Sequence, residues 1–245
     1  MVSGGGEDDL WERHAEWWQR GFTDGADPEY EEQILPLAAR HLAGARRVLD
    51  VGTGEGQVAR LAARLGAALV VGVDPVAQPA RARAPARRGA VLRAPRPRRR
   101  CPFPDRAFDA VVACLVLEHV PDHVPAVREM ARVLEPGGRF VLFLNHPLLQ
   151  TPGSGWVIDH VLDEQYWRVG PYLEPDVTME ELAPGVVLPF VHRPLSHYVN
   201  TLADHGLRVE RMEEPRPPEG FLARAPEYRD AASIPRLLVL RATRA

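Results

Sequence analysis

Short apolar runs alternate along the chain with longer amphipathic segments, and this alternation predicts buried parallel strands joined by helices. The apolar runs lie at 48–51, 68–73, 108–117 and 139–144, and helical periodicity covers 58–65 and 122–134. Gly137 and Gly138 mark the end of the second of these helices. The order of elements is typical of an α/β domain with a doubly wound sheet.

The flanking segments predict further helices and strands. The amphipathic pattern over residues 8–21 predicts a helix that carries three tryptophans, among them Trp17. These tryptophans either pack the helix onto the domain or make it a lid over the site. Asp27-Pro28 starts a second helix that runs to Leu42, since aspartate caps helices and proline suits the first helical position. At the other end, the pattern predicts a helix at 195–205 and two closing strands at 207–212 and 236–241, joined by a Pro-rich connection at 213–233.

A glycine-rich turn follows the first strand. Asp50 stands before Gly52, Thr53, Gly54 and Gly56, and glycines at a strand-to-helix turn let a ligand approach the backbone. The spacing Gly-x-Gly-x-Gly differs from the dinucleotide fingerprint, whose third glycine would fall one residue later.

The next strand ends at Asp74, about twenty residues after the loop, where an acid can accept hydrogen bonds from ribose hydroxyls. Loop and acid together predict a nucleotide-type cofactor site.

Five motifs resemble those of one family in order and in spacing. They are Val48-Leu49-Asp50-Val51-Gly52-Thr53-Gly54-Glu55-Gly56, Val70-Val71-Gly72-Val73-Asp74, Phe103-Pro104-Asp105-Arg106-Ala107-Phe108-Asp109-Ala110-Val111, Leu117-Glu118-His119-Val120 and Arg132-Val133-Leu134-Glu135-Pro136-Gly137-Gly138. The run, from about residue 46 to 144, is similar to the class I S-adenosylmethionine-dependent methyltransferases, in particular bacterial enzymes that act on small molecules.

The resemblance implies a single Rossmann-like domain over 1–245, with a mostly parallel seven-stranded sheet and S-adenosylmethionine as cofactor. Its parts would be N-terminal helices (1–43), a cofactor-binding core (46–144), a substrate cap inserted after the fifth strand (145–194), and a last helix with closing strands (195–245).

The resemblance also assigns cofactor contacts. The glycine loop would cradle the ligand, Asp50 would orient that loop and the ligand's amino group, Asp74 with the adjacent Pro75 would hold the ribose, and Leu115 would line the methionine end.

The segment 75–101 departs from the family pattern. It has many arginines and prolines and no acid, whereas the family places a helix, a short strand and then an adenine-binding acid here, at about Pro97-Arg98. The segment fits a solvated loop, a basic patch for a polyanion, or out-of-frame translation between two in-frame stretches. Our hypothesis is the third. The polyanion interpretation is the weakest, because no aromatic residues interleave with the arginines to stack bases.

Three polar residues, His146, His192 and Arg193, are candidates for contact with the acceptor, and His119 would lie beside the cofactor. His119 follows the central strand, His146 follows the next one, and His192-Arg193 precede the last helix. His119 and His146 are candidate general bases, for an acceptor that must lose a proton. For each residue a structural hydrogen bond is the competing interpretation. Trp17 is a further candidate substrate contact.

Composition limits the partners. The net charge is −3, which gives no general attraction to nucleic acid or anionic membrane, and the Asn/Asp-Pro-Pro-aromatic signature of DNA methylation is absent. No apolar run has the length of a membrane helix, and the Gly-rich acidic start differs from a signal peptide, so a cytoplasmic location is expected. The two cysteines suggest neither a disulfide framework nor a metal site. No feature indicates an oligomeric state.

The sequence therefore predicts methyl transfer to a nucleophilic atom of a small molecule, without DNA or RNA as partner. Two alternatives stay open. A degenerate family member could bind ligands without catalysis, which the altered segment 75–101 favours and the intact glycine loop opposes. An NAD-dependent oxidoreductase would share Asp74, but the glycine spacing disfavours it.

Overall fold

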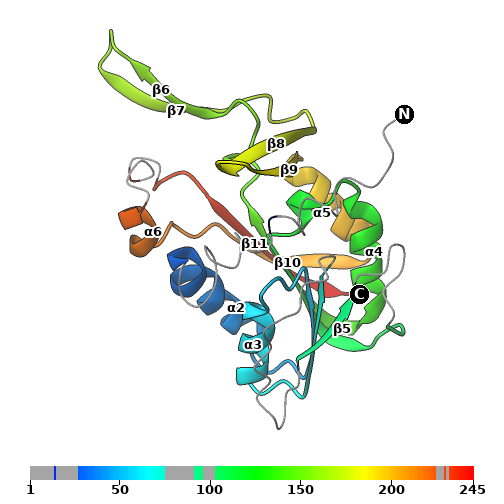
Figure 1. Cartoon of the computed structure of the whole chain (residues 1–245). Coiled ribbons are helices and arrows are strands. Elements are labelled where there is room, and N and C mark those ends of the chain that lie inside the picture. The colour runs from blue at the N-terminus through cyan, green and yellow to red at the C-terminus, as the bar shows by residue number, and fades with distance from the viewer. Residues whose placement is uncertain (1–13, 15–26, 75–90, 96–102, 225–228, 230–231) are drawn as a thin grey trace.

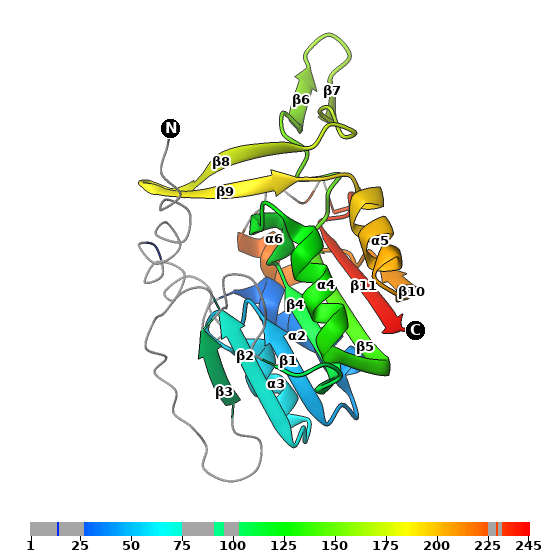
Figure 2. The ribbon, with the colours of Figure 1, turned by 90° about the vertical axis from the view of Figure 1, so that its right-hand side faces the viewer.

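The computed structural model describes residues 14, 27–74, 91–95, 103–224, 229 and 232–245. Within these residues a seven-stranded central sheet has the order β10-β11-β5-β4-β1-β2-β3 (Figures 1 and 2). Its strands are β1 (Arg47–Val51), β2 (Leu69–Asp74), β3 (Val91–Pro95), β4 (Phe108–Cys114), β5 (Leu134–Asn145), β10 (Leu207–Glu213) and β11 (Leu237–Arg244).

The sheet is mostly parallel. Strands β3, β2, β1, β4 and β5 pair in parallel, whereas β11 is antiparallel to both β5 and β10. The chain winds from β1 outward to β2 and β3, and then returns to β4 on the other side of β1. The predicted doubly wound α/β fold is therefore confirmed, and its topological switch point lies between β1 and β4.

Helices cover both faces of the sheet. On one face lie α2 (Leu35–Leu42) and α3 (Gln57–Arg64), and on the other lie α4 (His123–Val133) and α5 (Leu195–Asp204) (Figure 2). Successive strand residues point to opposite faces, so Val48 packs in the core under α2 and α3 while Leu49 packs in the core under α4 and α5. This explains why the strands are apolar without alternation.

The second helix begins where the sequence predicts. The Asp27 carboxylate accepts a hydrogen bond from the Glu29 backbone N–H at 2.9 Å, which satisfies one of the unpaired donors of the first turn. A π-helical turn, η1 (Tyr30–Ile34), then leads into α2. The predicted helix over 8–21 lies outside the described residues except for His14, and so does Trp17.

Three details differ from the sequence predictions. Helix α4 ends at Val133 and β5 begins at Leu134, with Gly137-Gly138 inside a bulge of β5 rather than at a helix end. In β4, Phe108 pairs with Leu134 of β5, but Ala110 already pairs with Arg139, so β5 has extra residues between these two pairs. Gly137, at φ 76°, allows the chain to bulge there. A short helix, α6 (Glu219–Arg224), lies within the predicted connection.

The third difference concerns the altered segment. The sequence shows no clear strand within 75–101, but β3 lies there and pairs in parallel with β2, at Val91–Pro95. The out-of-frame hypothesis stays a prediction. Proline fits this strand because β3 is at the edge of the sheet. The remaining positions, including Pro75 and the expected adenine acid, lie outside the described residues.

Two β-hairpins follow β5. The first, β6 (Gly155–Asp159) with β7 (Glu164–Arg168), projects from the body (Figure 1). The second, β8 (Asp176–Ala183) with β9 (Val186–His192), crosses above the carboxyl edge of the sheet (Figure 2). Its inner side is anchored by Leu188, Phe190 and Val191, all buried.

The Asp27 cap gives a stability prediction. We expect Asp27→Ala to lower the free energy of unfolding by about 1 kcal/mol, since the Glu29 N–H loses its partner. Asp27→Asn is the matched control, because an asparagine oxygen caps equally well, and it should stay close to wild type. Urea unfolding of the three chains measures the difference. Equal losses in both variants would show that the carboxylate charge, not the cap, stabilises the helix.

Candidate functional site

The glycine loop is held by a buried carboxylate. Asp50 is 2% exposed, and its Oδ2 accepts a hydrogen bond from the Thr53 hydroxyl at 2.7 Å and one from the Ala59 N–H in α3 at 3.1 Å. The backbone N–H groups of Gly52 and Thr53 donate to the Val73 carbonyl of β2. The loop is thus tied to the strand before it, the helix after it and the neighbouring strand.

Two glycines of the loop are needed for different reasons. Gly52 has φ 69°, and a Cβ there would lie 2.2 Å from Val116 Cγ2, so this position permits no side chain. Gly54 has φ 46°, and a Cβ there would meet nothing within 4 Å. Gly56 starts α3 in the left-handed conformation. The loop therefore packs tightly on its inner side, and no described residue covers the position of a Gly54 Cβ, as a ligand cradle requires.

Asp74 lies beside Gly54. Its Oδ2 accepts the Gly54 N–H at 2.8 Å, which places the carboxylate at the carboxyl end of β2 next to the loop. A ribose bound along the loop would find this carboxylate within reach of its hydroxyls.

Leu115 marks the other wall of the switch point. It has φ 54°, one of three positive values among the described non-glycine residues, and its N–H donates to the Phe143 carbonyl of β5. A left-handed leucine is strained, and such strain is concentrated at ligand sites. Beneath it, the Cys114 thiol lies 3.6 Å from the Tyr30 hydroxyl, and burial raises the pKa of both groups, so both stay neutral.

Comparison with known proteins agrees with this geometry. Residues 49–142 match a family described as methyltransferase domain. A demethylmenaquinone methyltransferase of Thermus thermophilus is 38% identical over 127 residues, which cover 50% of this chain and 57% of the relative. A 27-O-demethylrifamycin SV methyltransferase of Amycolatopsis mediterranei is 34% identical over 146 residues, covering 55% of this chain and 52% of the relative. The chain thus spans little more than half the length of these relatives.

Solved structures agree over more of the chain. An S-adenosylmethionine-dependent methyltransferase from Mesorhizobium loti superposes with a TM-score of 0.74 at 26% identity, over 89% of this chain and 98% of that one. A protein of Listeria monocytogenes, described as a putative enzyme of the same kind, shares the fold with a TM-score of 0.72 at 23% identity. Residues 49–142 match the methyltransferase domain, and the fold is that of S-adenosylmethionine-dependent methyltransferases. In this fold the glycine loop, Asp74 and Leu115 lie at the carboxyl ends of β1, β2 and β4, around the switch point.

The candidate base His119 connects two elements. It ends the short helix η2 (Leu117–His119), and its Nδ1–H donates to the Pro189 carbonyl of β9 at 2.9 Å. Its ring also packs edge-on against Phe190 at 5.5 Å between centroids. This geometry gives His119 a positioning role between η2 and the second hairpin.

His146 is buried in the turn after β5. Its Nδ1 accepts the Leu148 N–H at 3.2 Å, so its Nε2 carries the proton that it donates to the Glu214 carboxylate at 2.9 Å. Burial lowers the pKa of His146 more than Glu214 raises it. Both ring nitrogens are used to hold the turn, as the structural interpretation of His146 predicts.

Arg193 has a similar structural role. It is 5% exposed, and its guanidinium donates to the carbonyls of Leu117, Val120 and Pro121, which are the backbone acceptors in and after η2. The neighbouring His192 is 1% exposed and donates through Nε2 to the Tyr172 carbonyl. Both residues line a small pocket beside η2, and His192 Nδ1 has no hydrogen-bond partner among the described residues.

Two further residues lie near the site, and the sequence points to one of them, Glu118. Glu118 is 2% exposed beside the same pocket, and Tyr30 reaches Cys114 from the π-helical turn. The signal for Glu118 is its place in the Leu117-Glu118-His119 motif, just after the central strand. Tyr30 gave no signal, because a π-helical turn, although it often marks a functional site, is not visible in the sequence.

No cluster of three or more potential metal ligands is found in the described part of the chain, and none of its helices has the length and hydropathy needed to cross a membrane.

Removing the Arg193 guanidinium should destabilise the chain. We expect Arg193→Met, which keeps much of the volume, to lower the free energy of unfolding by about 3 kcal/mol, because buried carbonyls lose their donors. Arg208→Met is the control; that side chain is 78% exposed and should change stability by less than about 0.5 kcal/mol. Urea unfolding measures both variants. An equally small loss of unfolding free energy in both would contradict a stabilising role for the hydrogen bonds from Arg193 to the backbone carbonyls.

His146 predicts a pH dependence of stability. Its folded pKa lies below the usual value of 6.5, so the unfolded chain binds the proton more readily, and its stabilising contribution is lost as pH falls below 6.5 through the folded pKa. His41 and His123 have lowered pKa values for the same main reason, burial, and act in the same direction.

We therefore expect the unfolding free energy to fall less steeply between about pH 7.5 and about pH 5.5 in His146→Gln than in wild type. Urea unfolding at both pH values measures the two slopes. Identical slopes would mean that His146 titrates alike in both states.

Proposed function

We propose that this chain transfers the methyl group of S-adenosylmethionine to a nucleophilic atom of a small-molecule acceptor. The observation that carries the proposal is the loop Gly52–Gly56, which buried Asp50 fixes and Asp74 flanks. The match of residues 49–142 to a methyltransferase domain supports it.

The loop residues Gly52, Gly54 and Gly56 would lie against the cofactor, and Asp74 would accept hydrogen bonds from its ribose. Thr53 would act through Asp50, since its hydroxyl is already used there. Leu115 would line the methionine end. The bound cofactor supplies an activated methyl group on a sulfonium, so the chain itself has to align the acceptor, exclude water and receive a proton where one is released.

Residues 145–194 would form the acceptor side of the site. The second hairpin lies above the carboxyl edge of the sheet, the edge at which open α/β sheets bind ligands (Figure 2). A small molecule is favoured over nucleic acid because the net charge is −3.

One feature favours the alternative, a ligand-binding protein without catalysis. The expected adenine acid is replaced by Pro97-Arg98 immediately after β3, so adenine recognition has to use other groups. Tight binding of the cofactor without methyl transfer to any acceptor would support this alternative.

Calorimetric titration with S-adenosylhomocysteine, the demethylated product, tests the proposal. We expect micromolar binding by wild type and a loss of about tenfold to hundredfold in Asp74→Asn, because charged acceptors contribute more than neutral ones. The asparagine oxygen can still accept the Gly54 N–H, so the loop keeps its shape.

Asp204→Asn, at the exposed end of α5, is the control and should bind like wild type. A folded wild-type chain that does not bind S-adenosylhomocysteine would overturn the proposed function.

A further inference from the structure

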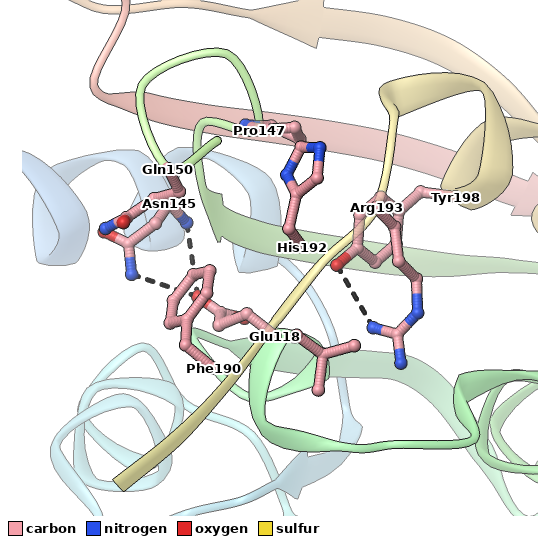
Figure 3. A pocket seen from close by; sticks show the side chains of 9 residues that line it. Glu118, Asn145, Pro147, Gln150, Phe190, His192, Arg193 and Tyr198 are labelled. Carbon is pink, nitrogen blue, oxygen red and sulfur yellow. Dashed lines mark hydrogen bonds between the residues drawn. The ribbon is translucent and has the colours of Figure 1, made fainter. Parts of the chain in front are cut away.

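A small pocket with a cavity volume of about 10 Å³ lies beside the turn that follows β4 (Figure 3). Its walls come from η2, the end of β5 with the turn after it, β9 and the start of α5. Phe190, Pro147 and Tyr198 supply apolar surface, and Glu118 and His192 supply polar atoms. That volume holds one water-sized group, so the pocket can take the hydroxyl of a small molecule but not the ring or chain that carries it.

Two buried polar atoms of this pocket lack a partner among the described residues. They are Glu118 Oε2 and His192 Nδ1, on side chains that are 2% and 1% exposed. An unpaired buried polar atom costs stability, and a folded chain rarely retains two in one place without a use for them.

The partnered atoms of both side chains determine what the unpaired atoms can do. Glu118 Oε1 accepts from the Asn145 backbone N–H at 3.2 Å and from its side-chain Nδ2 at 3.1 Å, which fixes the carboxylate (Figure 3). His192 Nε2 must carry a proton, because its partner, the Tyr172 carbonyl, only accepts. In the neutral ring His192 Nδ1 is then an acceptor, as Glu118 Oε2 is when ionised. The pocket thus presents two acceptors and calls for donors.

We propose that this pocket binds the hydrogen-bond-donating end of the acceptor, a hydroxyl on an apolar ring or chain, and that Glu118 Oε2 receives its proton. This assignment rests on the proposed methyltransferase function and names the acceptor class for it. The O–H bond breaks toward Glu118 while the oxygen gains the methyl group, the sulfonium becomes a neutral thioether, and the carboxyl later releases the proton to water.

The surroundings of Glu118 suit a base. Burial raises its pKa, and His119 beside it and the donors of Asn145 lower the pKa by a smaller amount. Tyr198, across the pocket, stays protonated, because burial and then the Glu118 charge raise its pKa to about 12 despite Arg193. The raised pKa makes the carboxylate more basic than an exposed one, and proton uptake requires a pH above it.

The pocket also lies close to the cofactor side of the site. Cys114 is in the electrostatic field of both Asp50, under the glycine loop, and Glu118. Leu115 and Glu118 belong to the same short turn, so a cofactor lying along Leu115 and a hydroxyl held at Glu118 would be neighbours.

Charge separates this assignment from its main competitor, an anionic acceptor. A carboxylate in the pocket would face the unpaired Glu118 oxygen, and the Arg193 guanidinium is already occupied by backbone carbonyls. Phenol and benzoate, which share the ring and differ in the polar group, therefore make a matched pair of probes.

The experiment titrates phenol and benzoate into the full chain loaded with S-adenosylhomocysteine, with binding followed by ligand-observed NMR. We expect phenol to bind and benzoate to bind at least about tenfold more weakly. Glu118→Gln should reduce the phenol affinity about tenfold and improve that of benzoate, since the amide can still accept from Asn145 but presents a donor to the pocket.

Glu135→Gln, in the bulge at the opposite end of β5, is the control and should change neither affinity. In wild type the phenol affinity should rise with pH as Glu118 ionises, and in Glu118→Gln it should not. Equal binding of the two probes to wild type, or no phenol binding, overturns the assignment even if the variant does not fold. Loss of S-adenosylhomocysteine binding by wild type would instead overturn the proposed function.

Discussion

The site depends first on one buried carboxylate, Asp50. With a hydroxyl and a backbone N–H directed at its Oδ2, it fixes the glycine loop and the start of α3 together. Gly72 in β2 belongs to the same arrangement, because a Cβ there would lie 2.7 Å from Thr53 Oγ1 and displace the threonine from Asp50. A charged group with 2% exposure is tolerated only because these donors compensate for its lost hydration. The cradle at Gly54 is a consequence of this tight support below it.

The second constraint is the crossing of β9 over η2. Arg193 donates to three backbone carbonyls in and after η2, and His119 donates in return to the Pro189 carbonyl of β9. The segment that follows β5 is thereby fastened to the turn that carries Leu115. Displacement of the hairpin would move the cofactor side and the pocket side together, so the two sides of the site are mechanically linked. Arg193 and His192, which the sequence offers as substrate contacts, therefore each also hold backbone carbonyls.

How much the sequence predicts follows from the range of each interaction. The glycine loop, Asp74 and the Asp27 cap depend on neighbours within a few tens of residues and on strict backbone rules, so their patterns are visible in the chain. Glu118 becomes distinctive only through Asn145, 27 residues away, and through β9, and no local pattern reports either contact. The two hairpins after β5 were predicted only as an insertion, since short strands rich in acids and prolines lack a clear period. The edge strand β3 is also not evident from its own sequence, and it is recognised only by its parallel pairing with β2.

Two buried acids at the same edge of the sheet, both 2% exposed, differ in one respect that separates support from chemistry. The Thr53 hydroxyl and the Ala59 N–H donate to Asp50, and these hydrogen bonds hold the loop and the helix in place. Those around Glu118 reach only Oε1, which leaves Oε2 with no partner among the described residues. A methyl donor that is already activated asks little of the protein except alignment and a place for a proton. An acid that is fixed at one oxygen and open at the other, beside an apolar wall, meets those two demands with one side chain.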